Sequence, residues 1–240
     1  MLNLNASTLW LKHSNLAAAR LSRLMPRKKN FVENYKNPGR EWQQKGTPLE
    51  VRAYDFIDPA KGKVTPYGVY DTTLNVGWVS AGTDNDTAQF AVSSISNWWS
   101  NMGEAAYPEA RELLILAEGG GSNGSRNRLW KKSLQEFADR EDIKIAMCHF
   151  PPGTSKWNKI EHRMFCHITQ NWRGKPLISH EVIVKLIGST VTRAGLKIEA
   201  QLDENKYPTG KKVSDDEMGA LSIEPADFHG EWNYLISPRK

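Results

Sequence analysis

Residues 113–123 read Leu-Leu-Ile-Leu-Ala-Glu-Gly-Gly-Gly-Ser-Asn, and this stretch decides the fold. Four consecutive aliphatic residues are typical of a buried strand, and three glycines then allow the backbone to turn sharply. Glu118 stands where this strand ends, which is where open α/β sheets place their chemistry. A solvated acid in a flexible turn is the alternative, so the rest of the chain has to decide between the two.

The composition is that of a globular protein with one main domain. A chain of 240 residues with 39% hydrophobic residues can bury a sizeable core. No apolar run approaches the roughly 18 residues of a membrane span, so no membrane partner is expected. Cys148 and Cys166 lack the Cys-x-x-Cys spacing of a zinc site, and no secretory signal precedes them. We expect buried, reduced thiols in a cytoplasmic protein.

Positive charge is concentrated near the N-terminus. The net charge is +5, yet the first 40 residues alone hold eight Lys or Arg against one acid, Glu33. Neutralising phosphates is the commonest use of such a patch, which favours nucleic acid as a partner, although a solvated basic tail has the same composition. We expect residues 1–27 to be a basic, poorly defined segment and residues 28–240 to be the main domain with a C-terminal extension.

Hydrophobic periodicity predicts strands first and an alternation of helices and strands afterwards. Residues 15–24 have only rough helical periodicity and indicate a weak helix or disorder. The order of the remaining segments suits a mixed sheet with helices packed on its faces. The expected strands are 30–37, 49–57, 66–71, 76–81, 113–116, 143–148 and 196–202, with a hairpin at 72–75; the expected helices are 88–102, 125–139, 159–172 and 179–187.

A second acid lies on the expected helix 159–172. Glu161 borders an apolar stripe formed by Ile160, Met164, Phe165 and Ile168. For Glu161 alone, a helix-edge salt bridge with His162 or Arg163 is the simpler interpretation. Together with Glu118 it could serve a two-metal site, because phosphoryl transfer there needs several carboxylates around Mg²⁺ ions roughly 4 Å apart.

Long motifs surround both acids, and together they closely resemble bacterial insertion-sequence transposases of the Rhodopirellula type. The resemblance extends over about residues 28–239. Its motifs are Pro-Tyr-Gly-Val-Tyr-Asp at 66–71, Ala-Glu-Gly-Gly-Gly-Ser-Asn-Gly-Ser-Arg at 117–126, Cys-His-Phe-Pro-Pro-Gly-Thr-Ser-Lys-Trp-Asn-Lys-Ile-Glu-His-Arg at 148–163, Asn-Trp-Arg-Gly-Lys-Pro-Leu at 171–177 and Phe-His-Gly-Glu-Trp-Asn-Tyr at 228–234.

The resemblance implies an α/β fold and a chemistry. The fold is a DDE catalytic domain with an RNase H-like mixed sheet and helices on both faces. The chemistry is cleavage and joining of DNA at insertion-sequence ends with two Mg²⁺ ions, and a homo-oligomer is left open. Two catalytic, metal-binding acids carry over: Glu161 matches the family's Glu, and Glu118 occupies a position where the family has Asp.

The third acid is missing from this alignment. Family members carry an Asp at the end of the first strand, shortly before a lysine run, and Met25 occupies that position before Arg27-Lys28-Lys29. Thioether sulfur is soft and Mg²⁺ is hard, so methionine cannot replace the carboxylate. Residues 17–24 do not read as the expected strand either, which indicates an N-terminally incomplete copy. Three other acids could stand in for the missing one: Asp55, Asp58 and Asp71.

Several neighbours of the two acids have both functional and structural interpretations. Asn123, Arg126 and Lys156 could contact phosphates, or could be a helix cap and solvated charges. His149 and His162 could orient water or contact DNA, and hydrogen-bonded structural histidines are the alternative. Trp157 could stack on a base or wedge its loop against the helix. None of these is counted as catalytic.

Three functional hypotheses follow. The first is a DDE transposase by descent, catalytically impaired, so that enzyme activity is left open. The second is a non-catalytic DNA-binding protein that keeps the basic surface. The third is a metal-dependent phosphohydrolase that uses Gly119, Gly120 and Gly121 as a phosphate cradle, although no Lys-Ser/Thr follows at P-loop spacing.

Overall fold

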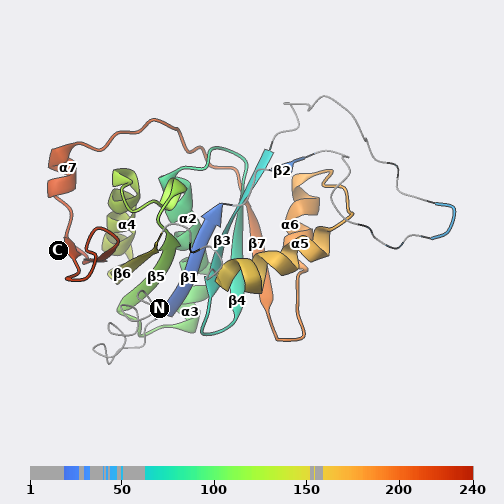
Figure 1. The fold of residues 1–240 in the computed structure, drawn as a ribbon, viewed down its shortest axis with the longest axis horizontal. Coiled ribbons are helices and arrows are strands. Elements are labelled where there is room, and N and C mark those ends of the chain that lie inside the picture. The colour runs from blue at the N-terminus through green and yellow to red at the C-terminus, as the bar shows by residue number, and fades with distance from the viewer. Residues whose placement is uncertain are drawn as a thin grey trace.

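A nine-stranded mixed sheet organises the part of the chain that the computed structural model describes (Figure 1). Described are residues 19–26, 30–32, 40, 42, 44–47, 50, 63–151, 154 and 159–239, with the backbone alone for 19–26, 30 and 31. The strand order is β7-β4-β3-β1-β5-β6-β9-β8, and β2 pairs with β3. The strands are β1 (Ala19–Pro26), β2 (Asn30–Phe31), β3 (Lys63–Asp71), β4 (Val76–Gly82), β5 (Glu112–Glu118), β6 (Lys144–Phe150), β7 (Lys197–Asp203), β8 (Ile223–Pro225) and β9 (Asn233–Ile236).

The five central strands have the order and directions of an RNase H-like sheet. In the order β4-β3-β1-β5-β6, β3 runs antiparallel to both of its neighbours. β1, β5 and β6 run parallel to one another. The carboxyl ends of β1, β5 and β6 therefore meet at one edge of the sheet, where Glu118 ends β5.

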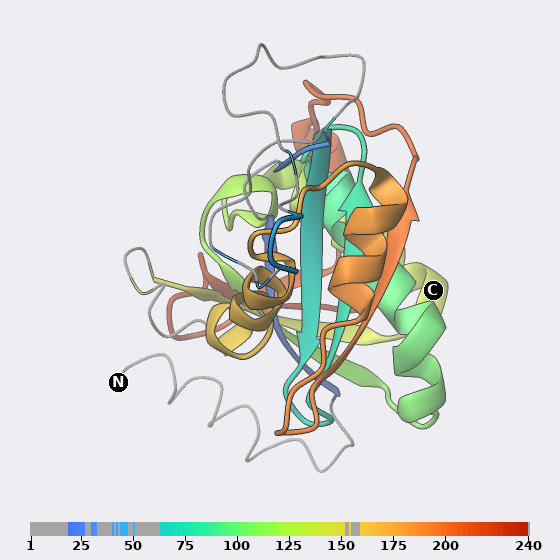
Figure 2. The same cartoon turned by 90° about the vertical axis from the view of Figure 1, so that its right-hand side faces the viewer.

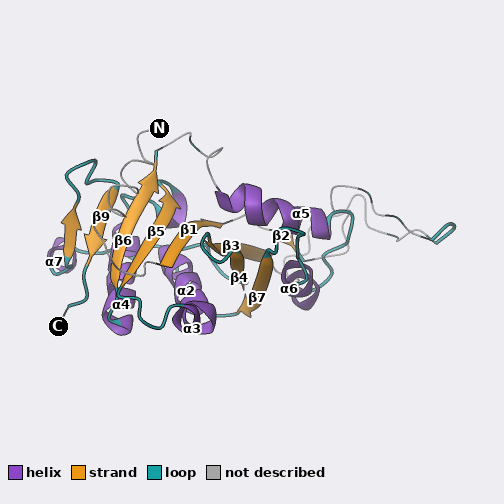
Figure 3. Ribbon diagram, turned by 90° about the horizontal axis from the view of Figure 1, so that it is seen from below, coloured by secondary structure: helices purple, strands orange, loops and turns teal. Residues whose placement is uncertain are grey.

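Helices cover both faces of the sheet, as expected from the sequence. Figure 3 shows α2, α3 and α4 on one side of the strands and α5 on the other, and Figure 2 shows α6 lying along β7. The described helical segments are α2 (Ala88–Trp98), η2 (Trp99–Gly103), α3 (Glu104–Ala106), η3 (Gly121–Asn123), α4 (Arg128–Glu141), η5 (Glu161–Phe165), α5 (Cys166–Trp172), α6 (His180–Gly188) and α7 (Asp215–Gly219). None of the described helices is long and apolar enough to cross a membrane.

Each face of the sheet has its own hydrophobic core. The α4-side core joins α2 and α4 to the strands and contains Phe90, Trp98, Ile115, Trp130 and Tyr234. The α5-side core joins η5, α5 and α6 to β3, β4 and β7 and contains Tyr70, Val79, Met164, Phe165 and Ile198. The alternation of side chains along a strand explains why one sheet can support two cores.

Most predicted elements are confirmed where the structure describes them. The hairpin at 72–75 joins β3 to β4 in antiparallel register, and Asn75 adopts φ 57° in its turn. Thr87 caps α2 by accepting a hydrogen bond from the Phe90 amide, and Ser179 caps α6 in the same way through Val182. The expected strand at 30–37 is described only as β2, and the expected strand at 49–57 lies outside the described residues apart from position 50.

The expectation for residues 15–24 is wrong over its described part. Ala19–Pro26 forms β1, the central strand of the sheet, rather than a helix or disorder. It pairs with β3 on one side and β5 on the other, so its backbone is satisfied by both neighbours although its sequence lacks a clean strand pattern. The register of β1 shifts between Ser22 and Met25, which indicates a bulge shortly before the strand ends.

Candidate active site

Glu118 lies at the carboxyl end of β5 and belongs to the α5 side of the sheet. Leu113, Ile115 and Ala117 are buried in the α4-side core. Since neighbouring residues of a strand point to opposite faces, the Glu118 side chain is directed to the other face, and it is partly exposed there. The prediction of a strand that ends in an acid is therefore confirmed, and the acid is accessible to a ligand.

Glu161 approaches the same face of the sheet on a helical turn of unusual geometry. It begins the π-helical segment η5, in which the Cys166 amide bonds back to the Glu161 carbonyl. Such π turns occur frequently at functional sites. Ile160, Met164 and Phe165 are buried in the α5-side core and hold this turn on β3 and β4, while Glu161 remains partly exposed. No ion pair among the described residues involves Glu161, so the predicted salt-bridge alternative is not supported.

Two glycines let η5 approach the sheet closely. A Cβ on Gly68 of β3 would lie 2.6 Å from Met164 Cε and 2.6 Å from Phe165 Cζ. A Cβ on Gly77 of β4 would also overlap Met164. The helical turn that carries Glu161 is therefore seated directly on the backbone of the sheet, three to four residues before Met164 and Phe165.

Position 25 lies on β1, between β5, which carries Glu118, and β3, on which η5 packs. Met25 pairs with Gly68 of β3, on which η5 packs. Leu24 pairs with Ala117 of β5, so the next residue of β1 is level with the end of the strand that carries Glu118. Position 25 thus lies beside the strand end that carries Glu118 and opposite the glycine on which the segment after Glu161 packs, and the sequence has carboxylates at 118 and 161 but not at 25.

The described residues fit a two-metal site only in part. No described group of three or more His, Cys, Asp or Glu side chains is arranged to hold a metal ion. Two glutamates on one side of the sheet offer oxygen ligands of the kind that Mg²⁺ prefers, but the position between their elements carries a thioether. The described side chains therefore do not supply a complete two-metal site.

Asp71 does not replace the missing acid. It pairs with Leu21, which in turn pairs with Ile115, three residues before Glu118. At about 3.3 Å per residue this distance along the sheet is about 10 Å. Its carboxylate is also fully engaged: Oδ1 accepts the amides of Thr73 (2.8 Å) and Leu74 (3.1 Å), and Oδ2 accepts the Tyr107 hydroxyl (2.7 Å). Asp55 and Asp58 lie outside the described residues.

His149 supports Glu118 from the opposite face of the sheet. Its Nδ1 lies 3.1 Å from the Glu118 carbonyl oxygen and its Nε2 lies 3.1 Å from the Tyr234 hydroxyl. The side chain is 1% exposed and borders Tyr234, a member of the α4-side core. Burial is the main reason that the pKa of His149 is lowered to about 4; the bond to the Glu118 carbonyl opposes this shift and the charge of Lys131 adds to it, so the ring is neutral at pH 7. This favours the structural interpretation of His149 over contact with water or DNA.

The remaining predicted residues fall into three groups. Asn123 is buried in the η3 turn, and Asn127 rather than Asn123 caps α4 by accepting the Trp130 amide (3.2 Å). Arg126 and His162 are exposed, so both are accessible for DNA contact. Lys156 and Trp157 lie outside the described residues. Both cysteines are free, and Cys148 is buried whereas Cys166 is partly exposed.

Comparison with known proteins gives the family. The model of the Rhodopirellula transposase DDE domain matches residues 17–238, nearly the whole chain and all of β1. The chain belongs to this family of transposase DDE domains. A comparison with curated proteins finds no match.

Two solved structures are similar to this DDE domain over three quarters of its length. They are titled "Mos1 transposase paired-end complex with left transposon end" and "Crystal structure of the Mos1 Strand Transfer Complex". The first has a TM-score of 0.48 at 12% identity, and the second has a TM-score of 0.46 at 11% identity. Each alignment covers 76% of this chain and 50% of the other, so this chain spans about half the length of those transposase chains.

Proposed function

We propose that this chain is a DDE transposase by descent, built to cut and join DNA at the ends of its element with Mg²⁺, and that it is catalytically impaired. One observation carries the proposal. The central strand β1 brings position 25 level with the end of Glu118's strand and opposite Gly68, on which Glu161's helical turn packs, and the residue there is methionine.

The length of the Glu118 side chain and the missing ligand at position 25 indicate how large the loss of activity should be. Metal sites accept ligand distances within about 0.2 Å, whereas Glu118 is longer than aspartate by one methylene and has to re-aim its carboxylate. A misplacement of about 1 Å can reduce catalysis about 10²-fold, and the missing ligand at position 25 lowers it further. Glu118 and Glu161 are expected to bind a divalent cation weakly, without the second ion that stabilises the leaving oxygen.

A DNA-binding protein without cleavage is the second candidate, and the charge distribution favours it. The first 40 residues contain eight Lys or Arg, and their positive charge does not depend on which residue occupies position 25. The phosphohydrolase hypothesis has less support, because the glycines after Glu118 lead into the three-residue turn η3, whereas the next long helix, α4, begins only at Arg128. A phosphate cradle would need a helix N-terminus directly after the glycines.

DNA binding and cleavage by the purified chain test the proposal together. Fluorescence anisotropy with duplexes from the DNA that flanks the coding sequence should show binding that weakens steeply with salt. Replacing Arg27, Lys28 and Lys29 with Gln should lower the salt slope by roughly 0.9 for each phosphate that the variant no longer neutralises. A plasmid that carries the same flanking DNA should not be nicked detectably at any Mg²⁺ concentration, because the altered acids should lower the cleavage rate by roughly 10²-fold or more. Mg²⁺-dependent cleavage that Glu161→Gln abolishes would refute the impairment.

A further inference from the structure

Four residues from four elements form one chain of hydrogen bonds that ends on Glu118. Trp130 of α4 places Nε1 3.2 Å from the Tyr234 hydroxyl of β9. That hydroxyl lies 3.1 Å from Nε2 of His149 on β6, and Nδ1 of His149 lies 3.1 Å from the Glu118 carbonyl of β5. Trp130, Tyr234 and His149 are at most 2% exposed, so water does not compete for these bonds.

The chemistry of the two ends fixes the direction of every bond. The indole N–H of Trp130 can only donate, and the backbone carbonyl of Glu118 can only accept. Nδ1 of His149 must therefore carry the proton that it shares with Glu118, which leaves Nε2 as the acceptor of the Tyr234 O–H. The Tyr234 oxygen in turn accepts from Trp130. Only this tautomer of a neutral ring satisfies all three contacts.

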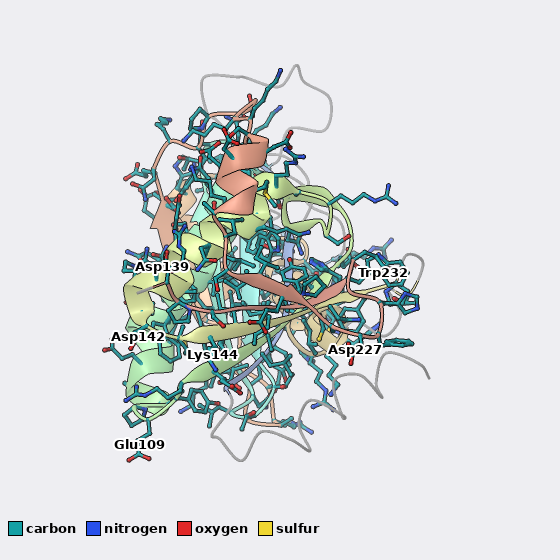
Figure 4. All side chains as sticks on the ribbon, turned by 90° about the vertical axis from the view of Figure 1, so that its left-hand side faces the viewer. Glu109, Asp139, Asp142, Lys144, Asp227 and Trp232 are labelled. Atoms are coloured by element: carbon teal, nitrogen blue, oxygen red, sulfur yellow. The ribbon has the colours of Figure 1, made fainter. Side chains whose placement is uncertain are left out.

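The same segment of chain holds His149 by a second contact. The His149 amide donates to the Trp232 carbonyl (3.0 Å), two residues before Tyr234. Asn233 Nδ2 donates to the carbonyls of Phe228 (3.0 Å) and His229 (3.3 Å), which fixes the preceding turn. Figure 4 labels Lys144 at the start of β6 and Trp232 near the opposite end of that strand. The turn before Asn233 therefore lies beside the carboxyl end of β6, which contains His149.

We propose that His149 and Tyr234 are positioning residues that fix the backbone at the end of β5 and thereby aim the Glu118 side chain on the opposite face. The hydrogen-bond chain lies on the α4 side, whereas alternation directs the carboxylate to the α5 side. His149 and Tyr234 thus act without entering the surface that DNA or a metal would occupy. The metal-binding role of Glu118 rests on the proposed function. The claim that the backbone at the end of β5 is fixed rests only on the hydrogen bonds of His149.

Hydroxyl removal at two tyrosines separates this role from general packing. Tyr234→Phe removes the donor to His149 and keeps the ring in the core. Tyr70→Phe is a matched control, because the Tyr70 hydroxyl makes one side-chain bond to Asn75 Oδ1 (2.8 Å) at the other end of the sheet. Amide hydrogen exchange at residues 118–121 should rise about fivefold in Tyr234→Phe, as expected for one net hydrogen bond, and should not change in Tyr70→Phe.

Two further readouts complete the test. The ¹⁵N resonances of His149 should show Nδ1 protonated at pH 7, and an Nε2-protonated ring or unchanged exchange at 118–121 in Tyr234→Phe would overturn the proposal. In a Met25→Asp/Glu118→Asp background, Tyr234→Phe should weaken Mn²⁺ binding about 10-fold or more, as loss of supporting hydrogen bonds typically does. Unchanged Mn²⁺ affinity there would refute the positioning role. Failure of that background to bind Mn²⁺ at all would refute the proposed function, and the exchange and tautomer results would still decide the backbone claim.

Discussion

Adding one methyl group at Gly68 should displace the helical turn that carries Glu161. In Gly68→Ala the new Cβ would lie 2.6 Å from both Met164 Cε and Phe165 Cζ. The end of the methionine side chain can move, but the phenylalanine ring is buried and rigid, so η5 has to shift or the core has to open. Overpacking of this kind costs about 1–3 kcal/mol of unfolding free energy.

Urea unfolding of matched variants measures that cost. Gly120→Ala is the control, because a Cβ there meets nothing within 4 Å and its φ of −130° suits any residue. It should change the unfolding free energy by less than about 0.5 kcal/mol. Phe165→Leu should destabilise the parent but recover part of the loss in Gly68→Ala, which a double-mutant cycle would reveal as a coupling of about 0.5–3 kcal/mol. If Gly68→Ala were as stable as the parent and showed no coupling to position 165, the close seating of η5 on β3 would be refuted.

Three further results are expected. The pKa of His149 is about 4 in the folded chain and about 6.5 in the unfolded chain, so the unfolded state takes up a proton first as the pH falls. The unfolding free energy should therefore be highest above pH 6.5 and should fall by about 3 kcal/mol as the pH drops to 4. Urea unfolding at several pH values should show a smaller loss in His149→Gln. Asn127→Ala should cost about 1–2 kcal/mol, because it removes both the α4 cap and a bond to the Ser122 carbonyl (3.0 Å), whereas Asn127→Asp keeps the cap and should cost less in thermal unfolding. A thiol reagent at pH 8 should modify Cys166 first, since burial raises the pKa of Cys148 to about 12; equal labelling rates by mass spectrometry would contradict this.

The parts of the fold that the sequence predicts are those with strong local signals. The aliphatic run before Glu118 forms β5, and the stripe of Ile160, Met164 and Phe165 is buried where η5 and its N-cap residue pack on the sheet. In both cases burial requires the pattern that the sequence shows, so the two acids could be assigned to a strand end and a helix edge before their surroundings were known.

The parts that the sequence does not predict are set by tertiary pairing. β1 forms because β3 and β5 satisfy its backbone on both sides, although its residues do not alternate cleanly. α7, β8 and β9 are too short to show a clear periodicity, and β9 is held by its register with β6. The link from Tyr234 to His149 joins residues 85 positions apart and has no local signal, although both residues lie in motifs that the sequence singles out.

Repair of the acid set tests the central claim most directly. Mg²⁺-dependent nicking of the flanking DNA should be measured for the natural chain, for Met25→Asp/Glu118→Asp and for that variant with Glu161→Gln. Because residue 25 pairs with Gly68 and lies level with the end of Glu118's strand, the double variant should complete the three carboxylates and raise the rate by roughly 10²-fold or more. The added Glu161→Gln should abolish that gain. A folded double variant with no gain, or a natural chain that cleaves at the same rate, would contradict the claim that position 25 decides the activity of this domain.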